Sequence, residues 1–378
     1  MKTSYEREER RRIRRVQRNR EVWRRRRRRA LIRRALLAGL GVILVGLLLF
    51  FFAGKIWKIL TPSERSLADT GQKFWTETRN QRSRQASSEN IEEENNSQSD
   101  EENSQSGQAH SYEATENTLQ LGDEITSAHA VFVDTANQTI LADKGSSNRM
   151  VPASMTKVLT LLVAVENITD FDDTFTITMD ITDYSFRNGC SCAGFEKEET
   201  LTIWDLMYGT ILPSGADAAL GLAIYVSGSQ EAFVELMNEK LEELGLSETA
   251  HFTNCVGIYD DNHYCTANDM AVIMEAAIQN EICREVLSAR TYLTSRTEQH
   301  PEGILLSNWF MRRIEDKDTG GVLVSGKTGY VDESGSCAVS YGTDQRDRTY
   351  ICVTADSVSK WGCINDHAML YKQFSDLP

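Results

Sequence analysis

The sequence predicts an α+β fold for residues 125–378, and three observations support this class. A strand, a turn and a second strand open the region, a block of helical patterns follows, and short strands with a final helix close it. Strand pairs that are separate from a helical block are typical of α+β domains rather than of alternating α/β sheets. The chain has 378 residues, so its length accommodates one sizeable domain and accessory segments.

The first two segments predict a membrane anchor. Residues 1–34 carry 16 Arg and one Lys against four Glu. Residues 35–54 are apolar and uncharged, and about 20 such residues cross a hydrocarbon core as a helix. The arginines indicate a cytoplasmic N-terminus, and bulky residues follow the span where a signal peptide would be cleaved. We therefore expect an uncleaved transmembrane signal-anchor rather than a cleaved signal peptide, with no nucleic-acid partner for the arginines.

Residues 55–124 are expected to form a disordered extracellular stalk. From residue 85 to residue 117 the sequence consists mostly of Ser, Glu, Asn and Gln, with almost no large apolar side chain. Such a composition cannot bury a hydrophobic core. Its acidic residues repel one another and should keep the segment extended.

Periodicity and turn residues locate the elements of the domain. Strands are expected at 130–134 and 139–142, joined by a turn. Pro152 precedes Ser154 and an apolar run, which predicts a buried helix that begins at the serine. The remaining expected elements are helices at 202–212, 216–225, 231–244 and 267–278, strands at 322–324, 336–341 and 349–354, and a closing helix at 364–374.

Three short motifs occur in order and indicate one chemistry. They are Ser154-Met-Thr-Lys157, Ser214-Gly-Ala216 and Lys327-Thr-Gly329. A lysine three residues after a serine lies on the same helical face and can be the base that activates the hydroxyl. Each motif alone is usually a helix surface or a turn. Their ordered combination favours nucleophilic serine catalysis.

The cysteines and histidines give no metal-binding pattern. All eight cysteines follow the predicted span, where an oxidising environment permits disulfides. The spacing about a turn near Asp344 predicts a Cys337–Cys352 disulfide, Cys255 and Cys265 could close a loop, and buried free thiols are the alternative. Since no Cys-x-x-Cys pair or His cluster occurs, we expect no metal and no cofactor. The histidines at 251, 263 and 367 are expected to be structural.

Longer segments around the motifs carry a family resemblance. They are residues 152–157, 194–199, 212–219, 262–270 and 326–330. Over residues 126–375 the chain resembles the low-molecular-mass penicillin-binding proteins that act as serine D-alanyl-D-alanine carboxypeptidases (peptidase S11). The resemblance implies a β-lactamase/transpeptidase-like domain, in which helices flank a five-stranded antiparallel sheet. It also implies a bacterial cell-membrane enzyme that trims the terminal D-Ala of peptidoglycan stem peptides and binds β-lactam antibiotics.

The resemblance assigns three catalytic roles. Ser154 resembles the nucleophile that forms the acyl-enzyme, Lys157 its general base, and Ser214 the hydroxyl that relays a proton to the leaving amine. A lysine acts as a base at neutral pH only when burial or a second ammonium group lowers its pKa. Lys157 beside Lys327 is expected to experience both effects.

The same resemblance implies a substrate-binding strand. Lys327 resembles the cation that keeps the proton network poised, and Thr328 resembles the hydroxyl that binds the terminal carboxylate. Gly329 and Tyr330 continue this strand. The backbone N–H groups of Ser154 and Tyr330 would form the oxyanion hole.

The sequence departs from the family pattern at two points. Ala216 stands where the second motif usually has asparagine, whose amide would help to hold the lysine base. Asp217 is expected to cap the following helix rather than to replace that amide. No clear carboxylate-binding arginine occurs near the C-terminus, where Lys360 is the candidate.

Two alternative functions remain open at this stage. A β-lactamase would need a glutamate that holds the deacylating water, and Glu166, within the first helix, is poorly placed for that role. A catalytically weakened penicillin-binding or wall-binding protein is suggested by Ala216.

Overall fold

The computed structural model describes residues 112–375. The predicted tail 1–34, the span 35–54 and the stalk up to residue 111 lie outside the described residues. Within the described part, no helix combines the length and the apolar composition needed to cross a membrane.

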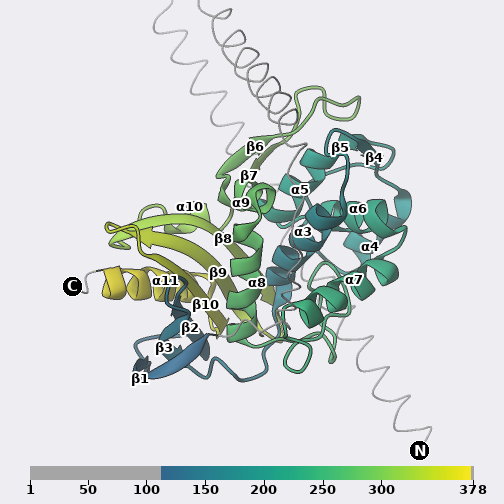
Figure 1. The fold of residues 1–378 in the computed structure, drawn as a ribbon. Coiled ribbons are helices and arrows are strands. Elements are labelled where there is room, and N and C mark those ends of the chain that lie inside the picture. Colours follow the sequence, from purple (N-terminus) through teal and green to yellow (C-terminus); the bar gives the residue numbers. More distant parts are fainter. Residues whose placement is uncertain (1–111, 376–378) are drawn as a thin grey trace, which may run out of the picture. The chain divides into compact units, whose positions relative to one another are not determined.

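A six-stranded sheet has the strand order β1-β3-β2-β10-β9-β8 (Figure 1). From β3 to β8 each neighbouring pair is antiparallel, so these five strands form the antiparallel sheet that the resemblance implies. The strands are β1 Glu113–Gln120, β2 His129–Asp134, β3 Thr139–Lys144, β8 Gly321–Val331, β9 Gly335–Asp344 and β10 Thr349–Ser357.

Strand β1 corrects the predicted end of the stalk. Residues 113–120 were expected to be disordered, but they pair in parallel with β3 at the edge of the sheet. Their side chains are mostly exposed, so the apolar alternation that marks a half-buried strand is missing. The strand depends instead on backbone pairing and on the Thr118 hydroxyl, which donates to the Ile140 carbonyl at 2.7 Å.

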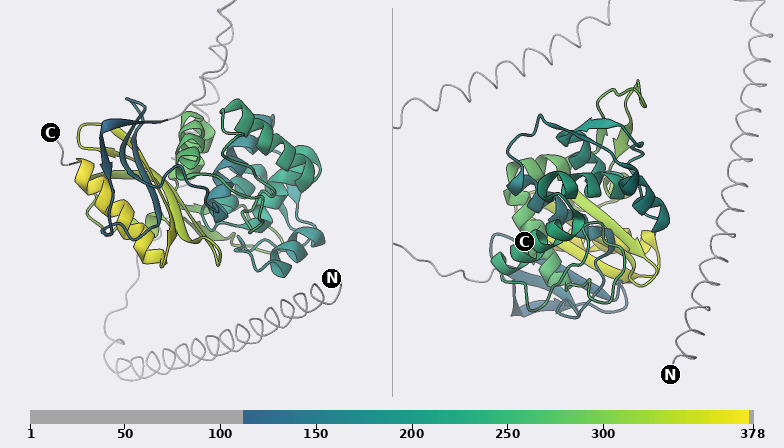
Figure 2. Two further views of the ribbon diagram at one scale, coloured as in Figure 1. Left: turned by 90° about the horizontal axis from the view of Figure 1, so that it is seen from below. Right: turned by 90° about the vertical axis from the view of Figure 1, so that its right-hand side faces the viewer.

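Helices cover both faces of the sheet (Figure 2). Helix α11 (Lys360–Ser375) packs on one face, and α8 (Ala267–Gln279) packs on the other beside α3 (Thr156–Asn167). Ten of the twelve residues of α3 are buried, because this helix is surrounded by protein on all sides. The helical block also contains α4 Met179–Arg187, α5 Ile203–Ile211, α6 Ala216–Ser227, α7 Gln230–Glu243 and α9 Glu281–Ser288, whereas the short helix α10 Met311–Ile314 packs against α11 and β8.

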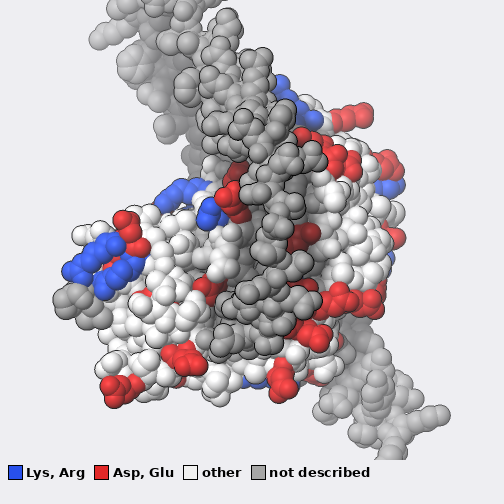
Figure 3. Space-filling view, in the orientation of Figure 1, with Lys and Arg blue, Asp and Glu red and all other residues white. Residues whose placement is uncertain are grey.

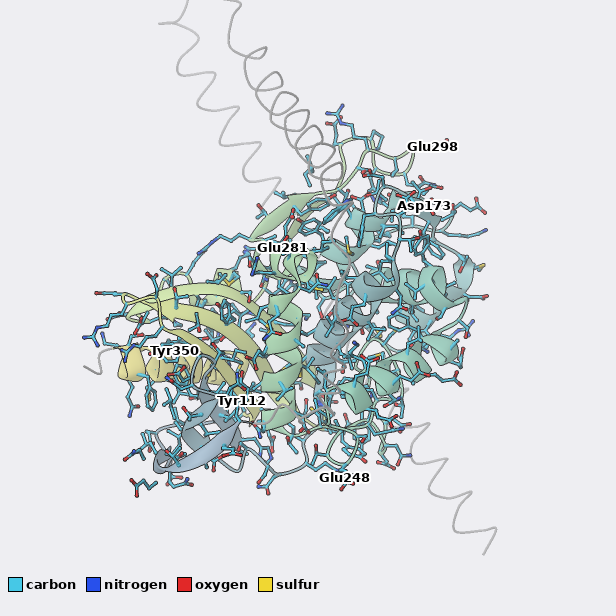
Figure 4. All side chains as sticks on the ribbon, viewed as in Figure 1. Tyr112, Asp173, Glu248, Glu281, Glu298 and Tyr350 are labelled. Atoms are coloured by element: carbon cyan, nitrogen blue, oxygen red, sulfur yellow. The ribbon has the colours of Figure 1, made fainter. Side chains whose placement is uncertain are left out.

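The predicted helices at 202–212, 216–225, 231–244 and 267–278 correspond to α5, α6, α7 and α8. Thr202 and Thr266 form capping boxes that start α5 and α8. Two small two-stranded antiparallel sheets complete the block: β4 Thr174–Thr176 with β5 Thr200–Thr202, and β6 Thr291–Leu293 with β7 Leu305–Ser307. Glu298 lies on the loop that joins β6 and β7 (Figure 4).

Aromatic side chains fill the core between the sheet and α11. The ring of Phe132 on β2 lies 5.1 Å from the ring of Tyr350 and 5.0 Å from those of Tyr371 and Phe374. Tyr350 lies on the sheet beside α11 in Figure 4. These side chains anchor the predicted closing helix, which begins four residues earlier than the expected position 364.

The predicted Cys337–Cys352 disulfide is wrong, because the two side chains lie on opposite faces of the sheet. Cys352 pairs with Ser340 rather than with Cys337. The offset of three residues is odd, and side chains alternate between faces along a strand. All eight cysteines of the described region are free thiols, Cys255 and Cys265 included.

Candidate active site

Ser154, the predicted nucleophile, lies just before the buried helix α3. A single 3-10 turn, Ala153–Met155, precedes α3, so Ser154 stands just before the first residue of the helix. Ala153 has a positive φ of 46°, which turns the chain sharply before the serine. The Cys337 thiol on β9 donates to the Pro152 carbonyl at 3.4 Å and links this turn to the sheet.

Lys157 is buried directly beside the nucleophile. Its Nζ lies 3.1 Å from Ser154 Oγ and donates to the Val256 carbonyl at 2.5 Å. Burial lowers the pKa of Lys157 from 10.5 to about 8. A neutral amine at this position can accept the proton of the Ser154 hydroxyl, which is what a general base must do.

The second and third motifs meet across the same site. Lys327 Nζ on β8 donates to Ser214 Oγ at 2.7 Å and to its neighbour Thr328's carbonyl at 2.8 Å. Ser214 lies between α5 and α6 with a positive φ of 65°. Burial lowers the pKa of Lys327, and the nearby Lys157 ammonium lowers it further. The charge of Lys157 therefore disfavours the charged form of Lys327.

Gly329 allows β8 to pass against the nucleophile turn. A Cβ at this position would lie 2.9 Å from the Ser154 backbone nitrogen and 2.6 Å from the Cys337 sulfur. Both approaches are closer than a real Cβ makes, so only glycine fits here. Tyr330 follows with 63% of its side chain exposed at the rim of the cleft. An oxyanion hole made of the Ser154 and Tyr330 N–H groups stays a prediction.

Asp217 has a different role from the predicted helix cap. It is buried in the first turn of α6, and its carboxylate accepts from the N–H groups of Ala193, Gly194 and Phe195 at 2.8, 3.0 and 3.2 Å. Burial raises its pKa, and these backbone donors counteract the increase. The Ala216 N–H donates to the Ser191 carbonyl at 2.8 Å. The start of α6 thus holds the loop that forms one wall of the cleft.

The cleft lining is cationic, although acidic side chains are spread over the face of the domain in Figure 3. Besides Lys157, the lining includes Arg313 and Lys360, whereas none of the described lining residues is Asp or Glu. The Arg313 guanidinium lies 5.0 Å from the ring centre of Trp309. Such a lining suits an anionic ligand.

The family model of the D-alanyl-D-alanine carboxypeptidases (Peptidase_S11) matches residues 113–358. The chain belongs to this family. It is 30% identical to the D-alanyl-D-alanine carboxypeptidase DacF of Bacillus subtilis over 244 residues, which are 64% of this chain and 60% of DacF. The D-alanyl-D-alanine carboxypeptidase of Streptomyces sp. strain K15 is 29% identical over 61% of this chain and 81% of the relative.

Structural similarity supports the same membership. The crystal structure of the Streptomyces K15 DD-transpeptidase matches with a TM-score of 0.58 and 26% identity, and it covers 66% of this chain and 98% of that one. The chain spans less than two thirds of the length of DacF and of Escherichia coli DacC, at 60% and 39%.

In this member of the carboxypeptidase family the two buried histidines, His263 and His367, have structural surroundings. His263 is buried, and its ring bonds to the Thr156 hydroxyl at 2.8 Å and to the Thr253 N–H at 3.0 Å. Burial lowers the pKa of His263 to about 3, so the ring is neutral. Within residues 112–375 no group of three or more His, Cys, Asp or Glu side chains is arranged to hold a metal ion.

Three residues at this carboxypeptidase-like site were missed by sequence reasoning. Arg313 and the Cys190 thiol line the cleft, and Asn254 supports the loop that contacts Lys157. None of them belongs to a recognised motif. Only folding brings the loops around 190 and 254 and helix α10 to one cleft, so their sequence positions carry no signal of it.

We expect acylation of this family member by penicillin to rise with pH through a midpoint of about 8. Lys157 accepts the serine proton only in its neutral form, and burial lowers its pKa to about 8. Below that value the neutral fraction, and with it the rate, should fall about tenfold per pH unit. Stopped-flow acylation with a fluorescent penicillin measures this profile. A midpoint near the ordinary lysine value of 10.5 would contradict the assignment of Lys157 as the base.

Proposed function

We propose that this protein is a serine D-alanyl-D-alanine carboxypeptidase that removes the terminal D-Ala from peptidoglycan stem peptides. The observation that carries the proposal is the pair of contacts between the three motifs. Lys157 Nζ lies 3.1 Å from Ser154 Oγ, and Lys327 Nζ lies 2.7 Å from Ser214 Oγ. This arrangement supplies a nucleophile, a buried base and a second proton carrier in one cleft.

The reaction proceeds in two steps. In the first, Ser154 Oγ attacks the carbonyl carbon between the two D-Ala residues while Lys157 takes the hydroxyl proton. The tetrahedral intermediate collapses and the C–N bond breaks, while the proton taken by Lys157 is passed through Ser214 to the amine of free D-Ala, which leaves Lys157 neutral. In the second step Lys157 takes a proton from the water that attacks the ester carbonyl. It returns this proton to Ser154 Oγ as the ester C–O bond breaks and the shortened peptide leaves as its acid.

We assign recognition of the terminal carboxylate to the cationic side of the cleft. This side is lined by Thr328, Arg313 and Lys360. Among the described residues that line the cleft, no carboxylate is present to pair with Arg313 or Lys360. Lys360 therefore stays the candidate to replace the carboxylate-binding arginine that the family pattern has and this chain lacks near its C-terminus. A stem peptide with a free carboxylate should react much faster than its C-terminal amide, because only the free acid presents an anion to these groups.

The test is release of free D-Ala from a D-Ala-D-Ala stem peptide by the domain of residues 112–378 or the full chain. Added D-amino acid tests the second candidate, a DD-transpeptidase, because a relative of this name shares the fold. Exchange of the terminal residue without hydrolysis would favour the transpeptidase. Acylation by penicillin with neither reaction would reduce the protein to a penicillin-binding module.

Rapid hydrolysis of penicillin would instead favour a β-lactamase. Glu166 forms an ion pair with Lys240 at 2.8 Å on α7 and does not line the cleft. No carboxylate among the described lining residues is available to hold a deacylating water, so we expect a long-lived penicilloyl adduct. Intact-protein mass spectrometry over time distinguishes the two outcomes.

We further propose that the enzyme is anchored in the bacterial membrane by residues 35–54, with the arginine-rich tail 1–34 in the cytoplasm. The positive charge and the apolar run of the sequence support this topology. Protease added to intact protoplasts should remove the domain and spare an N-terminal tag. Digestion of the tag in sealed cells would refute this orientation.

A further inference from the structure

The lysine base depends on a backbone carbonyl for its position. Lys157 Nζ contacts Ser154 Oγ, its reaction partner, at 3.1 Å and the carbonyl oxygen of Val256 at 2.5 Å. Ala216, which is fully buried at the start of α6, offers no polar side-chain atom to the ammonium group. The Val256 carbonyl is therefore the contact that can hold Lys157 in place while the serine hydroxyl reacts.

One asparagine braces the loop that carries this carbonyl. Asn254 Oδ1 accepts from three successive N–H groups, those of Val256, Gly257 and Ile258, at 3.2, 2.7 and 3.1 Å. Its Nδ2 donates to the Ile258 carbonyl at 3.0 Å. No helix or strand contains these residues, so the amide replaces the hydrogen-bond ladder that would otherwise fix them.

The braced loop also packs against the nucleophile turn. Gly257 has a φ of 80°, and a Cβ there would overlap the Ala153 carbonyl oxygen and lie 3.0 Å from the Ser154 nitrogen. Asn254 itself is 4% exposed and is not among the residues that line the cleft. It can therefore influence the reaction only indirectly, through the loop or through the ring of His263, which lies 3.3 Å from its Nδ2 and contacts Thr156.

We propose that Asn254 is a positioning residue for acylation, which fixes the Val256 carbonyl and through it the Lys157 amine against Ser154. This inference rests on the proposed function, whose nucleophile and base it uses. Asn254 takes over the holding role for which Ala216 lacks a side chain. A loop carbonyl free to move would leave the lysine with several positions, and general-base catalysis requires the base within hydrogen-bond reach of its proton.

The test is a double-mutant cycle on penicillin acylation with Asn254→Ala, Ala216→Asn and the double variant. Asn254→Ala should lower the acylation rate constant roughly tenfold to a hundredfold, while the dissociation constant of the non-covalent penicillin complex stays the same. Ala216→Asn alone should preserve or raise the rate. In the double variant the new amide at 216 can hold Lys157, so the loss caused by Asn254→Ala should be much smaller.

Thermal unfolding and a matched control separate positioning from mere stability. Asn238 on α7 makes a similar brace, donating to the Phe252 carbonyl at 2.8 Å and accepting from its N–H at 3.0 Å, but it does not touch residues 256–258. Asn238→Ala should lower the unfolding temperature. Adding Ala216→Asn to it should not rescue the variant. If Asn254→Ala fails to fold, Asn254→Ser, which keeps one oxygen acceptor, carries the same cycle.

The inference would be overturned if Asn254→Ala lowered the acylation rate constant by the same factor with and without Ala216→Asn. It would also be overturned if the variant weakened only the non-covalent binding of penicillin. Neither result would affect the proposed function, which rests on D-Ala release by the unaltered enzyme. Conversely, wild-type acylation without D-Ala release would reject the carboxypeptidase and leave the role of Asn254 intact.

Discussion

Replacing Ser154 with alanine is expected to abolish covalent labelling by penicillin while the fold stays intact. The Ser154 oxygen is the atom that would form the acyl bond, and its hydroxyl contacts Lys157 Nζ at 3.1 Å. Loss of one hydrogen bond at a half-buried position costs about 1 kcal/mol of folding free energy, which a domain of this size tolerates. Mass spectrometry after penicillin treatment measures labelling, and circular dichroism measures the fold.

Ser214→Ala is the matched control for this prediction. It removes a hydroxyl from the same cleft, where Lys327 donates to it at 2.7 Å, but leaves Ser154 and Lys157 in place. Labelling should therefore become slower and still reach completion. Labelling that persists in Ser154→Ala would remove the central claim about the nucleophile, because another side chain would then carry the acyl group.

Gly257→Ala is expected to lower the acylation rate more than any other substitution that leaves the three motifs intact. The added Cβ would overlap the Ala153 carbonyl oxygen, which is backbone and cannot rotate away. Displacing this loop would separate the Val256 carbonyl from Lys157 and distort the turn before Ser154. We expect acylation to fall by at least about a hundredfold, since misplacement of a base by about 1 Å has effects of that size.

Gly228→Ala is the control that distinguishes the effect of this close approach from the effect of backbone strain. Gly228, at the end of α6, has a φ of 82°, which matches the 80° of Gly257, but no atom lies within 4 Å of its Cβ position. Both variants bear the cost of a left-handed alanine, about 1–2 kcal/mol. Only Gly257→Ala should lose acylation as well. Equal acylation rates in the two variants would show that the approach of this loop to Ala153 is not needed.

Much of the fold followed from local patterns. Thr202 and Thr266 start helices because each side chain accepts from a backbone N–H three residues on, and such caps need no distant partner. The apolar run after Lys157 predicts a buried helix, and this signal too is local, because it lies in neighbouring residues of the sequence. Strand β1 could not be predicted, because an exposed edge strand depends on the neighbour that pairs with it.

Residue types and spacing alone predict which groups perform the chemistry, namely Ser154, Lys157, Ser214 and Lys327. Spacing within a helix turn places Lys157 beside Ser154, so that contact was readable before any fold was known. Lys327 reaches Ser214 only because β8 passes across the end of α5, 113 residues away along the chain. Contacts over such separations depend on packing and have no local signal.

How these groups are held depends on contacts between distant parts of the chain. Strand register sets the face on which each side chain lies, and a shift of an odd number of residues separated Cys337 from Cys352. The Asn254 brace and the cationic lining with Arg313 arise where distant segments of the chain meet at one cleft. Reactive side chains can be recognised by residue type and spacing, whereas the positions of the carbonyls and cations around them depend on how the whole chain packs.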